Sequence, residues 1–274
     1  MPLAATFALL FLARSAPADR YRFVLYGDCR DGHEVHRKLV ALMMKEHPAF
    51  VIQTGDLVHK GTNEDNWKTY DEITGEMRSK IPIYPARGNH DFGGDGYDSR
   101  IDFKIESGDK KHYSFTRGKW HFVSLDVDEH ENYGPSGEEY KWMVADLEKA
   151  SKAKQDIAVF FHVPPYSIGS HGSDKDVRAT LCPVFAKYGV TLVLNGHDHI
   201  YYRTQRDGIT YIVSGGGGAP LYPVNPKEGA IDGDQYLSTN HIVVFDVDGD
   251  TMKAEALKAD GTPFDHFEVH GRSH

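Results

Sequence analysis

The chain has 274 residues, of which 40% are hydrophobic and 12% aromatic, so it can bury a sizeable core and is not expected to be disordered. With 40 acidic and 31 basic residues, its formal charge is -9. Such a surface repels polyanions, which argues against a dedicated nucleic-acid-binding surface. Any affinity for phosphate must then be local, from metal ions or a few arginines. The 16 histidines are unusual: imidazole is the commonest metal ligand, although scattered surface histidines are the alternative.

Residues 1–18 have the pattern of a secretory signal peptide. An apolar stretch from Leu3 to Leu12 precedes Ala16-Pro17-Ala18, which fits an A-x-A cleavage site, although no Lys or Arg comes before the stretch. We therefore expect a periplasmic or secreted protein, with a plain N-terminal extension as the alternative. The stretch is too short to span a bilayer, so no transmembrane segment is expected. Cys29 and Cys182 can pair in an oxidising compartment, but free buried thiols are the favoured state.

From Asp19 onward, strand-like and helix-like segments alternate. The apolar and β-branched runs predict strands, and apolar residues three or four positions apart predict helices. The expected strands are Tyr21–Tyr26, Phe50–Gln53, Ile81–Pro85, His112–Phe115, Trp120–Val127, Ile157–Phe161, Val190–Leu194, Ile209–Val213, His241–Val247 and Met252–Leu257, and the expected helices are Val35–Met43, Glu64–Met77 and Glu138–Lys149. Turns are expected at Arg117-Gly118 and Asp248-Gly249.

This order of elements predicts an α/β fold. We expect two mixed β-sheets packed face to face with helices outside them, a four-layer αββα sandwich. No proline- or serine-rich linker interrupts the chain, so residues 19–274 are expected to form a single domain after the signal peptide. In such layers, ligand sites lie beyond the carboxyl ends of strands.

Five of the predicted strand ends finish in a residue that can bind a metal. They are Gly27-Asp28, Gly55-Asp56, Gly88-Asn89-His90-Asp91, His162, and Gly196-His197-Asp198-His199. Singly, a Gly-Asp pair is more often a turn or a helix cap, and a lone histidine is more often structural. Together, carboxylate, amide oxygen and imidazole suit first-row divalent or trivalent metals. A shared carboxylate can hold two ions about 3.5–4 Å apart, the spacing used for in-line phosphoryl displacement.

The ordered set GD, GD, GNHD, H and GHDH resembles the calcineurin-like metallophosphoesterase superfamily, over Tyr21 to about Gly218. The resemblance implies a double β-sandwich flanked by helices and two bound metal ions (Fe, Zn or Mn). It also implies the ligands: Asp28 and His199 for the first ion, Asp56 as the bridge, and Asn89, His162 and His197 for the second. His90 is then expected to assist the leaving oxygen, with Asp91 as its orienting partner.

The chain departs from this pattern at the first motif. Many members have a histidine two residues after the first aspartate, where this sequence has Arg30, and arginine cannot bind a cation. The purple acid phosphatase branch also lacks this histidine and uses a tyrosine three residues after the bridging aspartate, where this chain has His59. Our hypothesis is that His59 restores the missing ligand and that Arg30 contacts a phosphate oxygen. A surface loop histidine and a surface salt bridge are the respective alternatives.

The predicted reaction is hydrolysis of a small phosphoester, in which a metal-bridging hydroxide attacks phosphorus in line. Phosphomonoesters are favoured because the pattern points to the acid phosphatases. The alternatives are a phosphodiesterase acting on nucleotides or lipid headgroups, and a scaffold that kept the fold without catalysis. The backbone amides of Gly215–Gly218, which follow a predicted strand, are further candidates for contact with the substrate.

Overall fold

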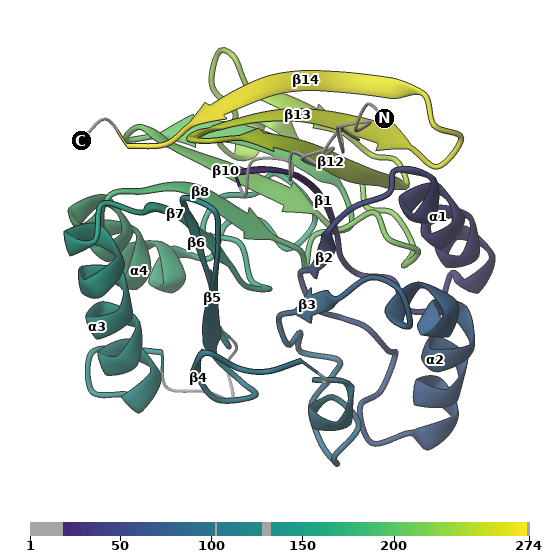
Figure 1. The fold of residues 1–274 in the computed structure, drawn as a ribbon. Coiled ribbons are helices and arrows are strands. Elements are labelled where there is room, and N and C mark those ends of the chain that lie inside the picture. Colours follow the sequence, from purple (N-terminus) through teal and green to yellow (C-terminus); the bar gives the residue numbers. More distant parts are fainter. Residues whose placement is uncertain (1–18, 102, 128–132, 273–274) are drawn as a thin grey trace, which may run out of the picture.

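A computed structural model describes residues 19–101, 103–127 and 133–272, so the predicted signal peptide lies outside the described residues. The described chain forms two β-sheets with helices on their outer faces (Figure 1). The four-layer αββα sandwich is therefore confirmed. Among the described helices, none is long and apolar enough to cross a membrane.

The first sheet has six strands in the order β14-β13-β12-β1-β2-β3. They are β1 (Arg20–Tyr26), β2 (Phe50–Gln53), β3 (Ile83–Pro85), β12 (His241–Asp248), β13 (Thr251–Lys258) and β14 (Pro263–His270). Strands β1, β2 and β3 are parallel, with Val24 opposite Val51 and Val51 opposite Ile83. Their carboxyl ends therefore open at one edge of the sheet, where Asp28 and Asp56 follow.

The second sheet has eight strands in the order β11-β9-β10-β8-β7-β6-β5-β4. They are β4 (Ser107–Gly108), β5 (Tyr113–Arg117), β6 (Trp120–Ser124), β7 (Asp156–Phe160), β8 (Val190–Asn195), β9 (Tyr201–Arg206), β10 (Ile209–Ser214) and β11 (Gln235–Leu237). Strands β6, β7, β8 and β10 run parallel, and the predicted β5–β6 hairpin is present. His162 follows β7, and the GHDH segment follows β8.

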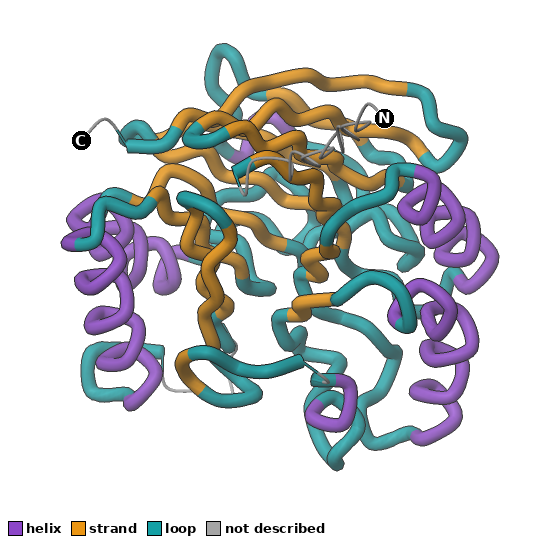
Figure 2. The backbone as a smooth tube through the Cα atoms, viewed as in Figure 1, coloured by secondary structure: helices purple, strands orange, loops and turns teal. Residues whose placement is uncertain are grey.

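Four α-helices cover the outer faces, two on each sheet, with the strands between them (Figure 2). The helices are α1 (His33–Lys45), α2 (Glu64–Arg78), α3 (Glu138–Lys152) and α4 (Lys175–Tyr188), and two short 3-10 helices lie at Asp98–Arg100 and Pro226–Glu228. Buried residues of α1 and α2 pack on β1, β2, β3 and β12. Those of α3 and α4 pack on β6, β7, β8 and β10. The apolar stripe of each helix is thereby removed from water.

The inner faces of the two sheets meet in a core rich in aromatic side chains. Phe23 stacks on Phe50 at 5.1 Å and on Phe245 at 4.5 Å between ring centroids, and its edge contacts Phe122 of the opposite sheet at 5.5 Å. All four rings are at most 3% exposed. Such rings bury a large apolar area and hold the two sheets at a fixed separation, which fixes the spacing of the strand ends.

Both cysteines are free, as favoured, although only Cys29 is fully buried. Helix α4 and strands β4, β9, β11 and β14 were not among the predicted elements. Helix α4 contains Pro183, but its ends carry clear signals: Asp174 accepts hydrogen bonds from two backbone amides at the start, and Gly189 adopts a left-handed conformation at the end. Its buried Val177, Leu181 and Phe185 follow the helical spacing that should have identified it.

Acid is expected to destabilise the fold partly through His241. This ring is fully buried, donates from Nδ1 to the Thr239 carbonyl (2.9 Å), and burial lowers its pKa to about 4. The unfolded chain takes up this proton near its ordinary pKa of roughly 6.5, so stability falls as the pH drops from about 6.5 to about 4. His241→Asn keeps a donor for Thr239 but cannot take up this proton. Its free energy of unfolding should therefore fall less with acid, by up to roughly 1.4 kcal/mol per pH unit. Urea unfolding in the presence of chelator between pH 7.5 and 5 measures the free energy of unfolding of both proteins. Equal slopes of this free energy against pH in the unsubstituted protein and in His241→Asn would contradict the role of His241.

Candidate metal centre

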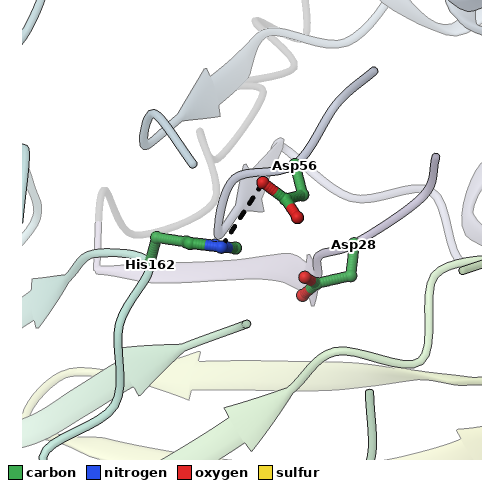
Figure 3. Close-up of side chains that lie close together, drawn as sticks. All are labelled: Asp28, Asp56 and His162. Carbon is green, nitrogen blue, oxygen red and sulfur yellow. Dashed lines mark ion pairs between the residues drawn. The ribbon is translucent and has the colours of Figure 1, made fainter. Parts of the chain in front are cut away.

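Three of the predicted ligands occupy strained backbone positions at the strand ends. Asp28, Asp56 and His197 have φ values of 58°, 54° and 70°, in the left-handed region that residues other than glycine seldom adopt. Such strain persists only where the surrounding structure enforces it, and it is concentrated at functional sites. These turns direct side chains from both sheets into the same space. Ligand atoms of Asp28, Asp56 and His162 lie within 4.8 Å of one another (Figure 3).

Asn89, His162 and His197 converge on one point beside Asp56. Asn89 Oδ1 lies 3.0 Å from His162 Nε2 and 3.1 Å from His197 Nδ1, and the two ring nitrogens are 3.2 Å apart. Asp56 Oδ1 is 3.4 Å from His162 Nε2.

The tautomer of His162 makes this cluster a set of electron-pair donors. Its Nδ1 donates to the Thr54 carbonyl at 2.7 Å, so in the neutral ring Nε2 presents a lone pair. That lone pair faces the Asn89 amide oxygen, which is also an acceptor, and neither atom can satisfy the other. Burial, then the neighbouring His162, lowers the pKa of His197 to about 2, which keeps this imidazole neutral. Neutral imidazoles, an amide oxygen and a carboxylate fit a cation.

Asp28 and His199 form a second group on the other side of Asp56. His199 Nδ1 donates to the Pro220 carbonyl at 2.7 Å, and its Nε2 lies 3.6 Å from Asp28 Oδ1. Burial lowers the pKa of His199 to about 4, so this ring is also neutral near pH 7. Asp28 and Asp56 can each offer one oxygen here and His199 one ring nitrogen. These three donors are one fewer than the four of Asn89, His162, His197 and Asp56 on the other side.

The two central carboxylates respond to each other's charge. Burial, followed by the charge of Asp56, raises the pKa of Asp28 well above its usual range. Burial also opposes ionisation of Asp56, but positive charge on the rings of His162 and His90 when they carry a proton, the backbone amide of His90 and the guanidinium of Arg30 outweigh it and lower the pKa of this carboxyl. Both side chains are almost completely buried, so two adjacent negative charges require positive charge in the same space.

The structure corrects the role expected for Asp91. Asp91 is buried and accepts hydrogen bonds from the backbone amides of Leu57, Val58 and Gly88, at 2.9, 3.2 and 2.9 Å. It therefore holds the loop after Asp56 against the GNHD loop. The ring of His90 is oriented by a different group: its Nδ1 donates to the carbonyl oxygen of His59 at 2.7 Å.

The structure also contradicts the expected replacement of the missing ligand by His59. The His59 side chain is 60% exposed, and its Nδ1 lies 2.9 Å from Asp31 Oδ1 at the rim. Arg30, in contrast, faces the centre: its side chain is 12% exposed, and its Nε donates to Asp56 Oδ2 at 3.2 Å. His59 therefore does not fill the position of the missing histidine in this arrangement, and a guanidinium lies beside the Asp56 carboxylate instead.

The glycine loop after β10 packs against the centre, as expected, but two of its amides are already used. Gly215 N donates to Ile200 O at 3.1 Å, and Gly217 N donates to Gly27 O at 2.8 Å. A Cβ at Gly217 would lie 2.2 Å from that Gly27 oxygen, so only glycine permits this approach. These two amides hold the loop and are not free to bind a substrate.

Two side chains that were not in the predicted site lie next to the histidines predicted as ligands. The ring of Tyr222 stacks on His199 at 4.2 Å, and the ring of His171 lies 4.2 Å from that of His197. His171 lines two hollows of about 340 and 400 Å³, and the first of these is also lined by His197. In the sequence, only the closeness of His171 to His162 indicated such a position. Tyr222 carried no local signal.

The comparison with known families agrees with this geometry. The family model described as calcineurin-like phosphoesterase matches residues 21–201, which contain every predicted ligand. The chain belongs to this family of metal-dependent phosphoesterases. The match ends within β9, so the family pattern covers the strand ends that form the centre.

Several of the similar proteins are acid phosphatases by name. Purple acid phosphatase 15 of Arabidopsis thaliana is 30% identical over 57% of this chain and 33% of its own length. Tartrate-resistant acid phosphatase type 5 of Rattus norvegicus is 26% identical over 74% of both chains. The solved structure of purple acid phosphatase PPD1 from yellow lupin has a TM-score of 0.75, with 19% identity, over 92% of this chain and 54% of its own. The chain spans only 33–42% of the length of the first three plant relatives.

The position of Asp56 is expected to depend on the absence of a side chain at Gly88. A Cβ at Gly88 would lie 2.3 Å from Asp56 N and 2.4 Å from Asp56 Oδ1. Gly88→Ala should therefore displace the carboxylate, lower the free energy of unfolding by roughly 1–3 kcal/mol and reduce bound metal. Gly75→Ala is the control, because nothing lies within 4 Å of its Cβ in helix α2, and it should raise stability by about 1 kcal/mol. Urea unfolding and elemental analysis measure both; equal effects of the two substitutions would refute the prediction.

Proposed function

We propose that this protein hydrolyses phosphoesters at a dinuclear metal centre built around Asp56. The observation that carries the proposal is the cluster of Asn89 Oδ1, His162 Nε2 and His197 Nδ1, which lie 3.0–3.2 Å apart beside the Asp56 carboxylate. These four residues would hold one cation. Asp28, His199 and the other oxygen of Asp56 would hold the second.

Bound cations of the Fe, Zn or Mn type would supply Lewis acidity, which lowers the pKa of the attacking water and offsets charge on the phosphate oxygens. The chain itself supplies the geometry. Two sheets present their strand ends to one space, and the buried carboxylates attract the cations there. The phosphoester then lies at the open side, where His90 and Arg30 are partly exposed.

His90 is the proposed proton carrier. Its Nδ1–H donates to the His59 carbonyl at 2.7 Å, which fixes the ring so that Nε2 points toward the centre, 4.0 Å from Asp56 Oδ2. From there a protonated ring can donate to the leaving oxygen of the ester. Arg30 places a guanidinium at the same end of the centre, suited to pair with a phosphate oxygen when it turns from Asp56.

Phosphomonoesters are the proposed substrates, because the relatives with named activity are acid phosphatases. Hydrolysis of phosphodiesters is the alternative. The hollows that adjoin His171 are the proposed space for the second ester group of a diester.

Activity should depend on the bridging carboxylate. Asp56→Asn removes the charge shared by both cation positions, so bound metal and turnover of p-nitrophenyl phosphate should both fall to near background. Glu72→Gln is the control: it removes an exposed carboxylate from helix α2 and should change neither. Elemental analysis and parallel assays with p-nitrophenyl and bis-p-nitrophenyl phosphate measure the effects. Turnover of the diester alone would replace the monoester proposal, and a chain that binds no metal would leave the scaffold alternative.

His90 should matter most for poor leaving groups. His90→Gln removes the proton donor and leaves the predicted ligands in place, so kcat should fall about 10²–10⁴-fold for an alkyl phosphate and less for p-nitrophenyl phosphate, whose leaving oxygen needs little protonation. Metal content should stay at the unsubstituted level. Equal losses for both substrates would show that His90 does not protonate the leaving group.

A further inference from the structure

Arg30 lies inside the centre as a fixed positive charge. Its side chain is 12% exposed, and its Nε lies 3.2 Å from Asp56 Oδ2, whose side chain is 2% exposed. The charges of Asp56, Asp31 and Asp28 raise the pKa of Arg30 against the opposing effect of burial, so the guanidinium stays charged. A permanent cation therefore stands at the carboxylate that both proposed metal positions share.

Asp31 holds the guanidinium of Arg30 in this place. Its Nη1 lies 2.7 Å from Asp31 Oδ2, and the other oxygen of Asp31 accepts from His59 Nδ1 at 2.9 Å. Asp31 adopts φ 70°, a strained conformation that turns its carboxylate toward both partners. Arg30 is therefore positioned by a chain of contacts that begins at the surface and ends at the centre. The exposed His59 is the outer member of this chain.

The two oxygens of Asp56 consequently differ. Oδ1 accepts from the backbone amide of His90 at 3.0 Å and faces His162 Nε2 at 3.4 Å, on the side of Asn89 and His197. Oδ2 is the oxygen that accepts from Arg30. A cation beside Asp28 and His199 that also binds Oδ2 would share this oxygen with a guanidinium of like charge, while a cation beside Asn89, His162 and His197 meets no such competitor among the described contacts.

We infer that Arg30, fixed between Asp56 and Asp31, makes the two metal positions unequal. The position of Asn89, His162 and His197 fills first and tightly. The position of Asp28 and His199 has fewer donors and a neighbouring positive charge, so it binds a divalent cation weakly until Arg30 leaves Asp56. This inference rests on the proposed metal centre and assigns its order of loading.

The experiment is a titration of the chelator-stripped protein with Mn²⁺, followed by calorimetry and by electron paramagnetic resonance. One ion should bind tightly and give the spectrum of an isolated ion. The second should bind at least about 100-fold more weakly, with spin coupling between the ions only in excess metal.

Three variants locate the cause. Arg30→Met keeps much of the volume and removes the charge, so the second ion should bind at least about tenfold more tightly. Arg30→Lys keeps the charge and should keep the weak second position. Arg203→Met removes a comparably covered arginine of strand β9, which is 18% exposed and paired with Asp265. This substitution should leave both affinities unchanged.

The outcomes separate the two proposals. Two equally tight ions in the unsubstituted protein, or an unchanged second affinity in Arg30→Met, would overturn the role of Arg30 and leave the metal centre intact. No binding of Mn²⁺, Zn²⁺ or Fe²⁺ at all would overturn the proposed function and this inference with it. Unequal affinities that become similar in Arg30→Met alone would establish both.

Discussion

The carboxylate of Asp56 is the group around which the rest of the structure is arranged. It is 1% exposed, and a buried negative charge is costly unless donors and cations surround it. Here the backbone amide of His90 and the guanidinium of Arg30 supply two such partners. The neighbouring Asp28 is pushed toward its neutral form by burial and by Asp56 itself. A cation between them resolves this conflict, which is the physical reason to place a metal centre here.

The two sheets cooperate to enclose this carboxylate. Asp28 and Asp56 follow strands β1 and β2 of the first sheet, while His162 and His197 follow strands β7 and β8 of the second. Hydrogen bonds between side chain and backbone join these ends: His197 N donates to both oxygens of the Asp28 carboxylate, at 3.1 and 3.0 Å, and His162 Nδ1 donates to Thr54 O. The aromatic core around Phe23 holds the sheets together behind them. The centre is therefore a consequence of sheet packing, and it does not depend on one flexible loop.

The aspartates inside the GNHD and GHDH motifs, Asp91 and Asp198, hold neighbouring loops together. Asp91 accepts from the amides of Leu57, Val58 and Gly88, and Asp198 accepts from the amides of His171 and Gly172 at 2.8 and 3.1 Å. Asp198 also accepts from the Ser167 hydroxyl. Each carboxylate ties a loop that carries predicted ligands to a neighbouring loop. A motif can thus contain a residue that positions the loops around the centre and is not itself a predicted metal ligand.

By itself, the sequence determined the sandwich and predicted the candidate ligand residues, because both depend on local signals. Alternating apolar runs identify most strands, and a polar ligand type directly after a strand remains visible in one dimension. What only the tertiary structure decided is which way these side chains face. His59 pairs with Asp31, Asp91 with backbone amides, and Arg30 with Asp56. Those partners are set by left-handed turns at Asp28, Asp31 and Asp56 and by contacts across the two sheets, such as that of Asp28 with His197. Neither the turns nor such distant contacts leave a periodic trace in the sequence.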